Sequence, residues 1–267
     1  MEQRENYVPV VILGATVKAL GIASVLCTKA LILEKSCLIG SEFVDTFDMQ
    51  LKKQPGAEKT ELEDKLRDRE AIAENKVLLP AVSASLFELA KEKNLKLCFK
   101  TVVLSIEKRG EEYLVTYYNA SGISQIWTSC IYDTAETILG DERKIEKKYL
   151  NIMLSGKADD KDRNMDSQYV SLSEGFYEDE WILKMEVQID ETWQESRKRF
   201  FEYWEQKKEM FCPWKVAYIA STFEFLLTET QEMIGKHWEW VPSNTGQGVL
   251  RAFYEGVQIG GKQRLLC

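Results

Sequence analysis

The stretch VVILGATVKALG, residues 10–21, decides the fold of this chain. An apolar run that begins near Tyr7 ends at Gly14, and Val17 opens a helix-like segment of small and aliphatic residues. Residues 29–35, KALILEK, form a second apolar run that ends next to an acid. A buried strand, a glycine turn, a helix and a second strand within about 30 residues are typical of a βαβ unit with parallel strands.

Such a unit holds a dinucleotide pyrophosphate at the helix N-terminus, where free backbone N–H groups and the helix dipole meet. The three positions of the glycine fingerprint hold Gly14, Thr16 and Ala19. Gly14 makes the tight turn, the third position allows alanine, and the hydroxyl of Thr16 can donate to a phosphate oxygen. Glu34 follows the second strand, where a carboxylate accepts bonds from ribose hydroxyls. The alternative is that Glu34 ends this strand in solvent.

The middle of the chain predicts further elements of an α/β fold. Residues 50–76 are highly charged, which indicates a solvated segment, part helix and part loop. We expect a helix over 81–93 and a strand over 95–100. Residues 101–135 then predict an antiparallel meander of about three strands that returns to the main sheet.

The last part of the chain mixes charged stretches with apolar ones. It predicts a strand at EWILKMEV (180–187), a helix over 191–211, a strand at WKVAYIAST (214–222) and a C-terminal helix after SNTGQG (243–248). The helix over 191–211 is aromatic and basic, and we interpret it as an amphipathic helix that covers a sheet or a substrate cleft.

Composition excludes several classes of function. The formal net charge of −8 disfavours a nucleic-acid surface, which needs clustered Lys and Arg. Six cysteines without a CxxC pair and the single His237 disfavour a disulfide framework and a Cys/His metal site. No stretch approaches the about 20 apolar residues that a membrane-spanning helix needs. We expect a cytoplasmic protein with no metal, nucleic-acid or membrane partner and without a signal peptide.

Three segments together resemble the FAD-dependent oxidoreductases, in the branch whose first turn reads G-[AG]-T-P-A-G. Residues 10–41 resemble the N-terminus of that family, and residues 86–136 resemble its adenine strand and the meander that leads to a D-A-T-G-D motif. Residues 242–261, PSNTGQGVLRAFYEGVQIGG, resemble the turn and helix that face the pyrimidine end of the flavin. These matches cover about half of the chain.

The sequence departs from the family at five positions. Val17 replaces a proline, Lys18 a small residue and Ala19 a glycine, while Ser41 and Glu136 stand where the family has glycine. A carboxylate at Glu136 would repel a diphosphate by about 1 kcal/mol in water and by several times that in a partly buried site.

The resemblance implies an FAD/NAD(P)-binding Rossmann-like domain with a central parallel sheet and a β-meander, plus a smaller α+β insertion. We expect residues 1–140 and 214–267 to form the FAD-binding part and residues 141–213 to form an insertion for a substrate or partner. FAD would contact the following residues: Gly14, Ala15, Thr16, Lys18, Ala19, Glu34, Lys35, Gly40, Ser41, Val103, Asp133, Thr134, Gly246, Gln247, Gly248 and Val249.

Three functions remain open at this point. The first is an oxidoreductase that acts on a small molecule by hydride transfer to FAD, with donors at Gly246–Val249 stabilising the reduced flavin. The second is a degenerate flavin-fold protein that acts as a partner subunit, in a homo-oligomer or a hetero-complex. The third is a short-chain dehydrogenase with Tyr203 and Lys207 on one helix face. Cys37 could be a redox thiol, but without a nearby second cysteine we interpret it as a buried structural thiol.

Overall fold

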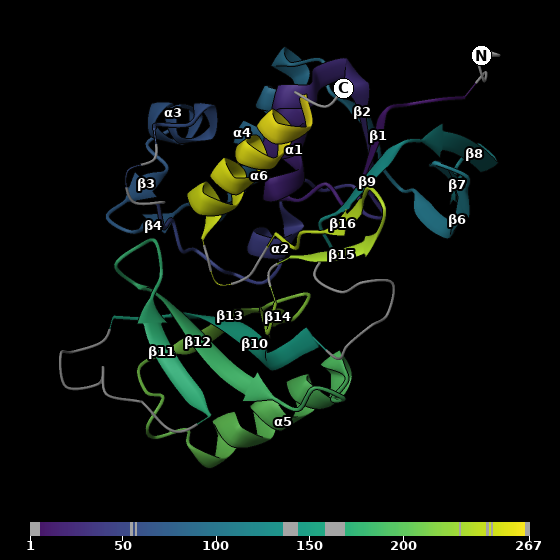
Figure 1. The fold of residues 1–267 in the computed structure, drawn as a ribbon. Helices are drawn as coiled ribbons and strands as arrows, with labels where there is room; N and C mark the ends of the chain where they lie inside the picture. The colour runs from purple at the N-terminus through teal and green to yellow at the C-terminus, as the bar shows by residue number, and fades with distance from the viewer. Residues whose placement is uncertain are drawn as a thin grey trace.

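The computed structural model describes residues 6–53, 56, 58–135, 144–157, 169–229, 231–243, 246 and 248–264. Two sheets organise the molecule (Figure 1). A mostly parallel sheet with its helices forms the upper part of the view, and an antiparallel sheet backed by one long helix forms the lower part.

The upper sheet has six strands in the order β15-β16-β9-β1-β2-β5. The four pairings from β16 to β5 are parallel, and β15 joins β16 as an antiparallel hairpin. The apolar runs predicted from the sequence form the centre of the sheet because both of its faces are buried. The strands are β1 (Val10–Leu13), β2 (Ala30–Leu33), β5 (Lys96–Cys98), β9 (Cys130–Asp133), β15 (Glu232–Gly235) and β16 (Trp238–Trp240).

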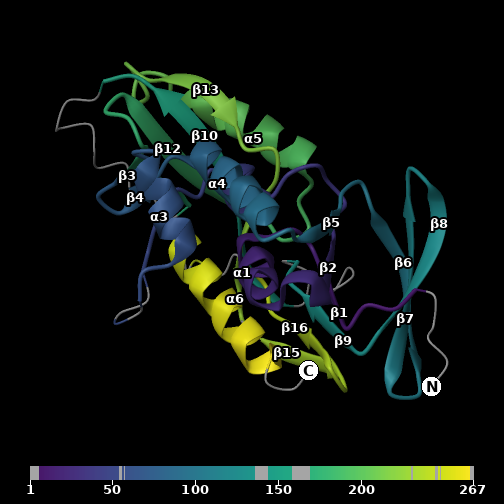
Figure 2. The same ribbon diagram turned by 90° about the horizontal axis from the view of Figure 1, so that it is seen from above.

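Helices cover one face of this sheet and the meander covers the other (Figure 2). Val10 and Ile12 of β1 pack toward the helices, whereas Val11 and Leu13 pack toward the meander. The alternation of side chains along a strand divides them in this way. The helices are α1 (Val17–Leu26), α4 (Leu79–Glu92) and α6 (Val249–Arg264), and the meander strands are β6 (Val102–Arg109), β7 (Glu112–Asn119) and β8 (Gly122–Thr128).

Glycine lets α1 and α6 approach backbone to backbone. A Cβ at Gly21 would lie 2.3 Å from the carbonyl oxygen of Phe253, and one at Gly256 would lie 2.1 Å from that of Lys18. The C-terminal helix is therefore fixed against the first helix of the chain, close to the glycine turn.

The lower sheet has the strand order β11-β12-β10-β13, and β14 also pairs with β10. Its strands are β10 (Ile145–Ser155), β11 (Val170–Glu174), β12 (Glu180–Val187), β13 (Lys215–Ile219) and β14 (Glu224–Leu227). Helix α5 (Trp193–Gln206) packs on it through Phe200, which is fully buried. The Thr192 and Glu195 side chains form a capping box at the start of this helix.

Short elements complete the upper part between its main strands and helices. They are the 3-10 helix η1 (Cys27–Lys29), the helices α2 (Ser41–Val44) and α3 (Glu61–Asp68), and the hairpin of β3 (Ile72–Ala73) and β4 (Lys76–Val77). Helix α3 lies in the highly charged segment and buries Leu62 and Leu66 against the main core. That segment is thus part helix and part loop, as expected, but one face of its helix belongs to the core.

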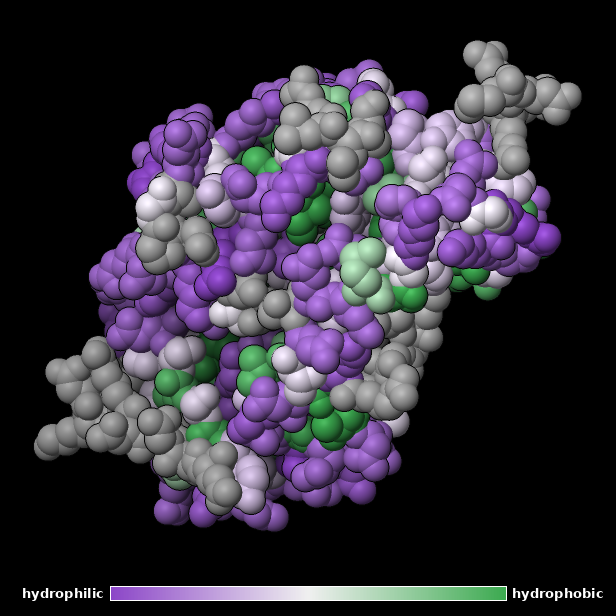
Figure 3. All heavy atoms as spheres, viewed as in Figure 1, coloured by the Kyte–Doolittle hydropathy of each residue, from purple (hydrophilic) through white to green (hydrophobic). Residues whose placement is uncertain are grey.

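The structure confirms the expected fold class, with two differences in detail. Residues 122–133 form two strands, β8 and β9, which belong to different sheets. Strand β13, expected with the C-terminal FAD-binding part, pairs instead with β10 in the lower sheet. No helix in the described part of the chain is long and apolar enough to span a bilayer. The face seen in Figure 3 is mostly hydrophilic, with apolar residues in separate patches.

Candidate functional site

The glycine turn lies at the carboxyl end of β1 and contacts the end of β9. Gly14 has a φ of +86°, and a Cβ there would lie 3.2 Å from Thr134 Oγ1. The Thr134 hydroxyl donates to the carbonyl oxygen of Leu13 at 2.8 Å, and the backbone N–H of Thr134 donates to the same oxygen at 3.0 Å. Residue 14 must therefore be glycine both for its backbone conformation and for this close contact.

Glu34 follows β2 and folds back onto the turn. Its Oε2 accepts the N–H of Ala15 at 2.7 Å, and its Oε1 accepts the N–H of Ser36 at 2.6 Å. The side chain is only 6% exposed, so the alternative in which Glu34 ends the strand in solvent is wrong. The structure thus brings Gly14, Ala15 and Glu34 together at one edge of the sheet, as the spacing predicts.

The first N–H groups of α1 are all bonded within the chain. Thr16 caps the helix: its Oγ1 accepts the N–H of Ala19 at 3.0 Å and donates to Thr134 Oγ1 at 2.8 Å. The N–H of Val17 donates to Glu42 Oε1 at 2.7 Å, and the N–H of Lys18 donates to Ser243 Oγ at 3.2 Å.

A carboxylate from the chain itself therefore lies at the N-terminus of α1. Glu42 Oε1 also accepts the hydroxyl proton of Ser243 at 2.6 Å. Burial raises the pKa of Glu42 to about 7, while the bonds from Ser243 and Val17 act in the opposite direction by favouring the charged form. Neither Glu42 nor Ser243 was predicted from the sequence. The only available signal was an acid two residues after Gly40, in the loop that the family places beside the turn.

Lys18 is directed away from the turn. Its Nζ donates to the carbonyl oxygen of Pro242 at 2.7 Å and pairs with Glu255 at 3.0 Å, and its side chain is 2% exposed. Burial lowers the pKa of Lys18, and Glu255 opposes that shift. Its backbone N–H lies at the helix start, whereas its charge serves the contact with α6.

Asp133 ends β9 beside the turn and is nearly fully buried. Burial raises its pKa to about 7, and a bond from the N–H of Ala135, at 3.0 Å, opposes the shift. The N–H of Val241 donates to the carbonyl oxygen of Asp133, and the N–H of Ser243 donates to that of Thr134. Residues 241–243 thus follow the end of β9 toward α1. Glu136 and Gln247 lie outside the described residues.

The start of α6 is tied to the segment after α2. The N–H groups of Val249, Leu250 and Arg251 donate to the carbonyl oxygens of residues 50, 51 and 52 at 3.0–3.1 Å. Gly246 and Gly248 both have positive φ, and a Cβ at Gly248 would lie 2.8 Å from the carbonyl oxygen of Gln50. Of the donors at Gly246–Val249 expected to face a flavin, the N–H of Val249 is bonded to the backbone in this arrangement.

Gly40, among the remaining expected residues, is bonded directly to the turn. The N–H of Gly40 donates to the carbonyl oxygen of Ala15, and Ser41 begins α2 directly afterwards. Lys35 is exposed, and Val103 is half-buried on β6 against the core beneath the meander. Cys37 is exposed, so its interpretation as a buried structural thiol is wrong.

The structure does not support the short-chain dehydrogenase alternative. Tyr203 lies on α5, on the lower sheet, and packs edge-on against Phe211 at 5.7 Å between ring centroids. Lys207 is exposed at the end of that helix. Neither residue belongs to the sheet that carries the glycine turn, so the pair cannot complete a site there.

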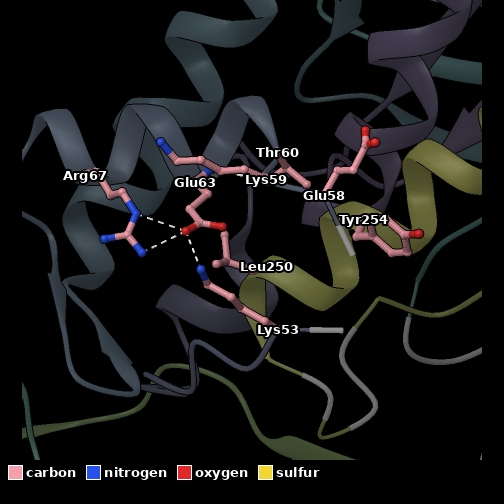
Figure 4. A pocket seen from close by; sticks show the side chains of 8 residues that line it. All are labelled: Lys53, Glu58, Lys59, Thr60, Glu63, Arg67, Leu250 and Tyr254. Carbon is pink, nitrogen blue, oxygen red and sulfur yellow. Dashed lines mark hydrogen bonds and ion pairs between the residues drawn. The ribbon is translucent and has the colours of Figure 1, made fainter. Parts of the chain in front are cut away.

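One cavity of about 380 Å³ lies between α3 and the start of α6 (Figure 4). Glu63 lines it and accepts from Arg67 Nε at 2.9 Å and Nη2 at 2.8 Å, and from Lys53. Glu63 is therefore already paired with two cations. Among the residues that the structure describes, no cluster of three or more His, Cys, Asp or Glu could hold a metal ion.

A second cavity, of about 350 Å³, lies where the segment after α2 meets the lower sheet. Its wall combines apolar side chains with a group of buried acids and amides. The residues that line it are Phe47, Asp48, Met49, Gln50, Asn75, Lys76, Asn151, Ser173, Glu174, Ile182, Lys184 and Glu224.

No protein-family model and no curated protein matches this chain. Solved structures do match its fold. The structure of CabE, an aromatic hydroxylase from angucycline biosynthesis, has a TM-score of 0.66 at 11% identity, over 97% of this chain and 62% of that protein. A complex of aklavinone-11 hydroxylase with FAD and aklavinone has a TM-score of 0.59 at 13% identity, over 100% of this chain and 63% of that protein.

A flavoprotein/dehydrogenase from Cytophaga hutchinsonii has a TM-score of 0.63 at 11% identity, over 96% of this chain and 77% of that one. The chain therefore has the fold of these flavoproteins, and the resemblance seen in the sequence is confirmed at the level of the fold. It spans about 62–63% of the length of the two hydroxylases.

Proposed function

We propose that this chain is a flavoprotein oxidoreductase that binds FAD at the glycine turn and acts on a small organic molecule by hydride transfer. The observation that carries the proposal is the convergence of Gly14, Glu34 and the start of α1 at the carboxyl edge of the parallel sheet. Open α/β sheets bind their ligands at this edge. The shared fold with a hydroxylase solved in complex with FAD gives independent support.

The groups at the start of α1 are hydrogen-bond donors, which is the type of group that a diphosphate requires. The N–H of Val17 and the hydroxyl of Ser243 both donate to Glu42 Oε1, and the N–H of Lys18 donates to the Ser243 hydroxyl oxygen. This carboxylate is a stand-in anion: it marks the place where the helix N-terminus favours negative charge. FAD can bind there only after Glu42 gives up these donors, because two anions cannot share them.

The residues of the chain have separate roles in this proposal. The Glu34 carboxylate accepts ribose hydroxyls, the Thr16 and Ser243 hydroxyls and the α1 N–H groups hold the diphosphate, and Val103 lies beside the adenine. Asp133 and Thr134 line the edge of the site along β9. The flavin, once bound, supplies the hydride chemistry. No acid or base of the chain is required for that transfer.

The test is FAD binding by calorimetry and by the visible spectrum, with Glu42→Gln as the diagnostic variant. Glutamine keeps an oxygen that can accept from Val17 and removes the negative charge. We expect Glu42→Gln to tighten FAD binding at pH 8 by at least tenfold, which corresponds to about 1.4 kcal/mol. Glu88→Gln, an exposed carboxylate on α4, is the matched control and should leave the affinity unchanged. If neither the native chain nor Glu42→Gln binds FAD, the proposal is wrong.

A second candidate function is that of a non-catalytic partner subunit. The observation that favours it is that the first N–H groups of two helices already donate to acceptors of the chain. Those of α1 donate to Glu42 and Ser243, and those of α6 donate to the carbonyl groups of residues 50–52. A chain of this kind would lack flavin absorbance and would not bind FAD even as Glu42→Gln. It would act in a homo-oligomer or a hetero-complex. Light scattering would measure the mass of that complex. For either function we propose a cytoplasmic location, in keeping with the free thiols of the described cysteines.

A further inference from the structure

The cavity on the lower sheet contains two buried acceptors without a donor. Asp48 is 4% exposed; its Oδ1 accepts the N–H of Gln50 at 3.1 Å, but its Oδ2 has no partner among the described residues. Asn151 on β10 is 1% exposed, and its Oδ1 likewise has no partner in that part of the chain. Leaving a buried acceptor unbonded costs about 1–3 kcal/mol, and more when it is charged.

The rest of the polar wall is compensated. The amide of Asn151 donates to Glu224 Oε2 at 2.7 Å and to the carbonyl oxygen of Thr46 at 2.6 Å. Lys184 on β12 pairs with Glu224 Oε1 at 2.7 Å, and Lys76 pairs with Glu174 at 3.1 Å at the edge of the cavity. Each lysine therefore has an acid of its own.

The wall of the cavity contains one more acid than lysine. Asp48, Glu174 and Glu224 face the two lysines in the wall, so Asp48 is the acid without a cation. Lys52, the next cation along the chain, donates to the carbonyl oxygen of Gly246 instead. Burial and the nearby Glu224 raise the pKa of Asp48 to about 6, so it is a carboxylate at pH 8.

The other walls are apolar. Phe47, Met49 and Ile182 line the cavity, and each packs against the main core. A cavity of about 350 Å³ with these walls accepts a single ring together with a short polar arm.

We propose that this cavity binds an organic amine, with the ring against Phe47 and Ile182 and the ammonium donating to the free oxygens of Asp48 and Asn151. An ammonium carries three donors and one positive charge, which matches two open acceptors and one uncompensated carboxylate. The proposal that this amine is the substrate rests on the proposed function. The amine site itself does not, because none of its residues belongs to the FAD site.

The test is calorimetry at pH 8 with three probes of one shape: benzylamine, benzyl alcohol and benzoate. We expect benzylamine to bind at least tenfold more tightly than benzyl alcohol, and benzoate not to bind. The probe series needs no variant, so it remains decisive even if a substitution in the wall disturbs folding. Equal binding of amine and alcohol, tighter binding of benzoate, or no binding of any probe at millimolar concentration would overturn the proposal.

Variants of the cavity test whether Asp48 causes the preference for benzylamine. Asp48→Asn should reduce the preference for benzylamine over benzyl alcohol at least tenfold, whereas Glu174→Gln, the paired acid at the edge of the cavity, should change it less than twofold. A preference that survives Asp48→Asn would contradict the assignment. Each titration is run without FAD and again with saturating FAD. Benzylamine binding without any FAD binding would reject the flavoprotein function and leave the amine site standing; FAD binding without selectivity for the amine would do the opposite.

Discussion

Glu42 and Asp48 lie on either side of the short turn that follows α2, and both are buried acids whose pKa is raised by burial. Their surroundings differ. Glu42 Oε1 accepts from Val17 at the start of α1 and from the Ser243 hydroxyl. Asp48 Oδ1 accepts the N–H of Gln50 in its own loop, and its Oδ2 has no donor among the described residues. In the first region, the Glu42 carboxylate is bonded to donors of the chain. In the second, the lysines that line the cavity are paired with acids other than Asp48. The first carboxylate thus accepts from the start of a helix, and a cationic ligand would compensate the second.

The difference follows from the backbone around each acid. The start of a helix presents N–H groups that have no partner inside the helix, and the helix dipole adds a positive potential. Glu42 satisfies both requirements of α1 at once. Asp48 accepts one backbone N–H, that of Gln50, and lines a cavity with a sheet whose backbone groups are paired between strands. A lysine of that sheet, Lys184, is bonded to Glu224.

The largest expected effect concerns Glu42 and stability. Its folded pKa lies above that of an unfolded glutamate, so the folded state holds more protons, and stability falls as pH rises from about 4 to about 7. Above that window the buried charge costs about 3 kcal/mol. We therefore expect Glu42→Gln to raise the free energy of unfolding by about that amount at pH 8, and by much less at pH 5.

Urea unfolding at the two pH values measures this effect. Glu88→Gln changes the net charge equally at an exposed site and should stay within about 0.5 kcal/mol of the native chain at both. A gain of equal size at pH 5 and pH 8 would show that the ionisation of Glu42 is not its source, and would remove the contrast with Asp48.

An intermediate effect is expected for the pH dependence of benzylamine binding. The ammonium needs the Asp48 carboxylate, so protonation of Asp48 below about pH 6 should weaken binding, by about tenfold or 1.4 kcal/mol between pH 7 and pH 5. Benzyl alcohol is the control probe, since it carries no charge in this range. Glu224, Lys184, Lys76, Glu174 and Lys52 also face this region, but the first four are paired. An unchanged amine affinity at pH 5 would place the site elsewhere.

The smallest expected effect concerns Thr16, the cap of α1. Thr16→Val removes the acceptor for the N–H of Ala19 and the bond to Thr134, and should lower the free energy of unfolding by about 1 kcal/mol. Thr16→Ser keeps the hydroxyl and should stay close to the native value. If both variants unfold alike, the cap contributes little, and Glu42 alone holds the start of α1.

The fold was largely predictable because its signals are local. Apolar runs that end at Gly14 and Glu34, the alternating meander strands and the amphipathic helices occur within short windows of sequence. The assignment of β13 was not predictable in this way: its sequence identifies a strand, but the choice of sheet depends on its pairing with β10, more than sixty residues earlier. The surface position of Cys37 was also not predictable, because the loop after β2 has no periodicity to show which side faces solvent.

By itself, the sequence determined the βαβ unit, the need for glycine at position 14 and the return of Glu34 to the turn, since each depends on strand and helix geometry over about 20 to 30 residues. Only the tertiary structure decided what occupies the start of α1. Glu42 reaches Val17 across 25 positions, and Ser243 reaches Glu42 across 201. It likewise decided that Asp48 meets Asn151 and Glu224 of the lower sheet in one cavity. Burial and hydrogen bonding depend on which distant segments come together, and the pattern of neighbouring residues carries no record of them.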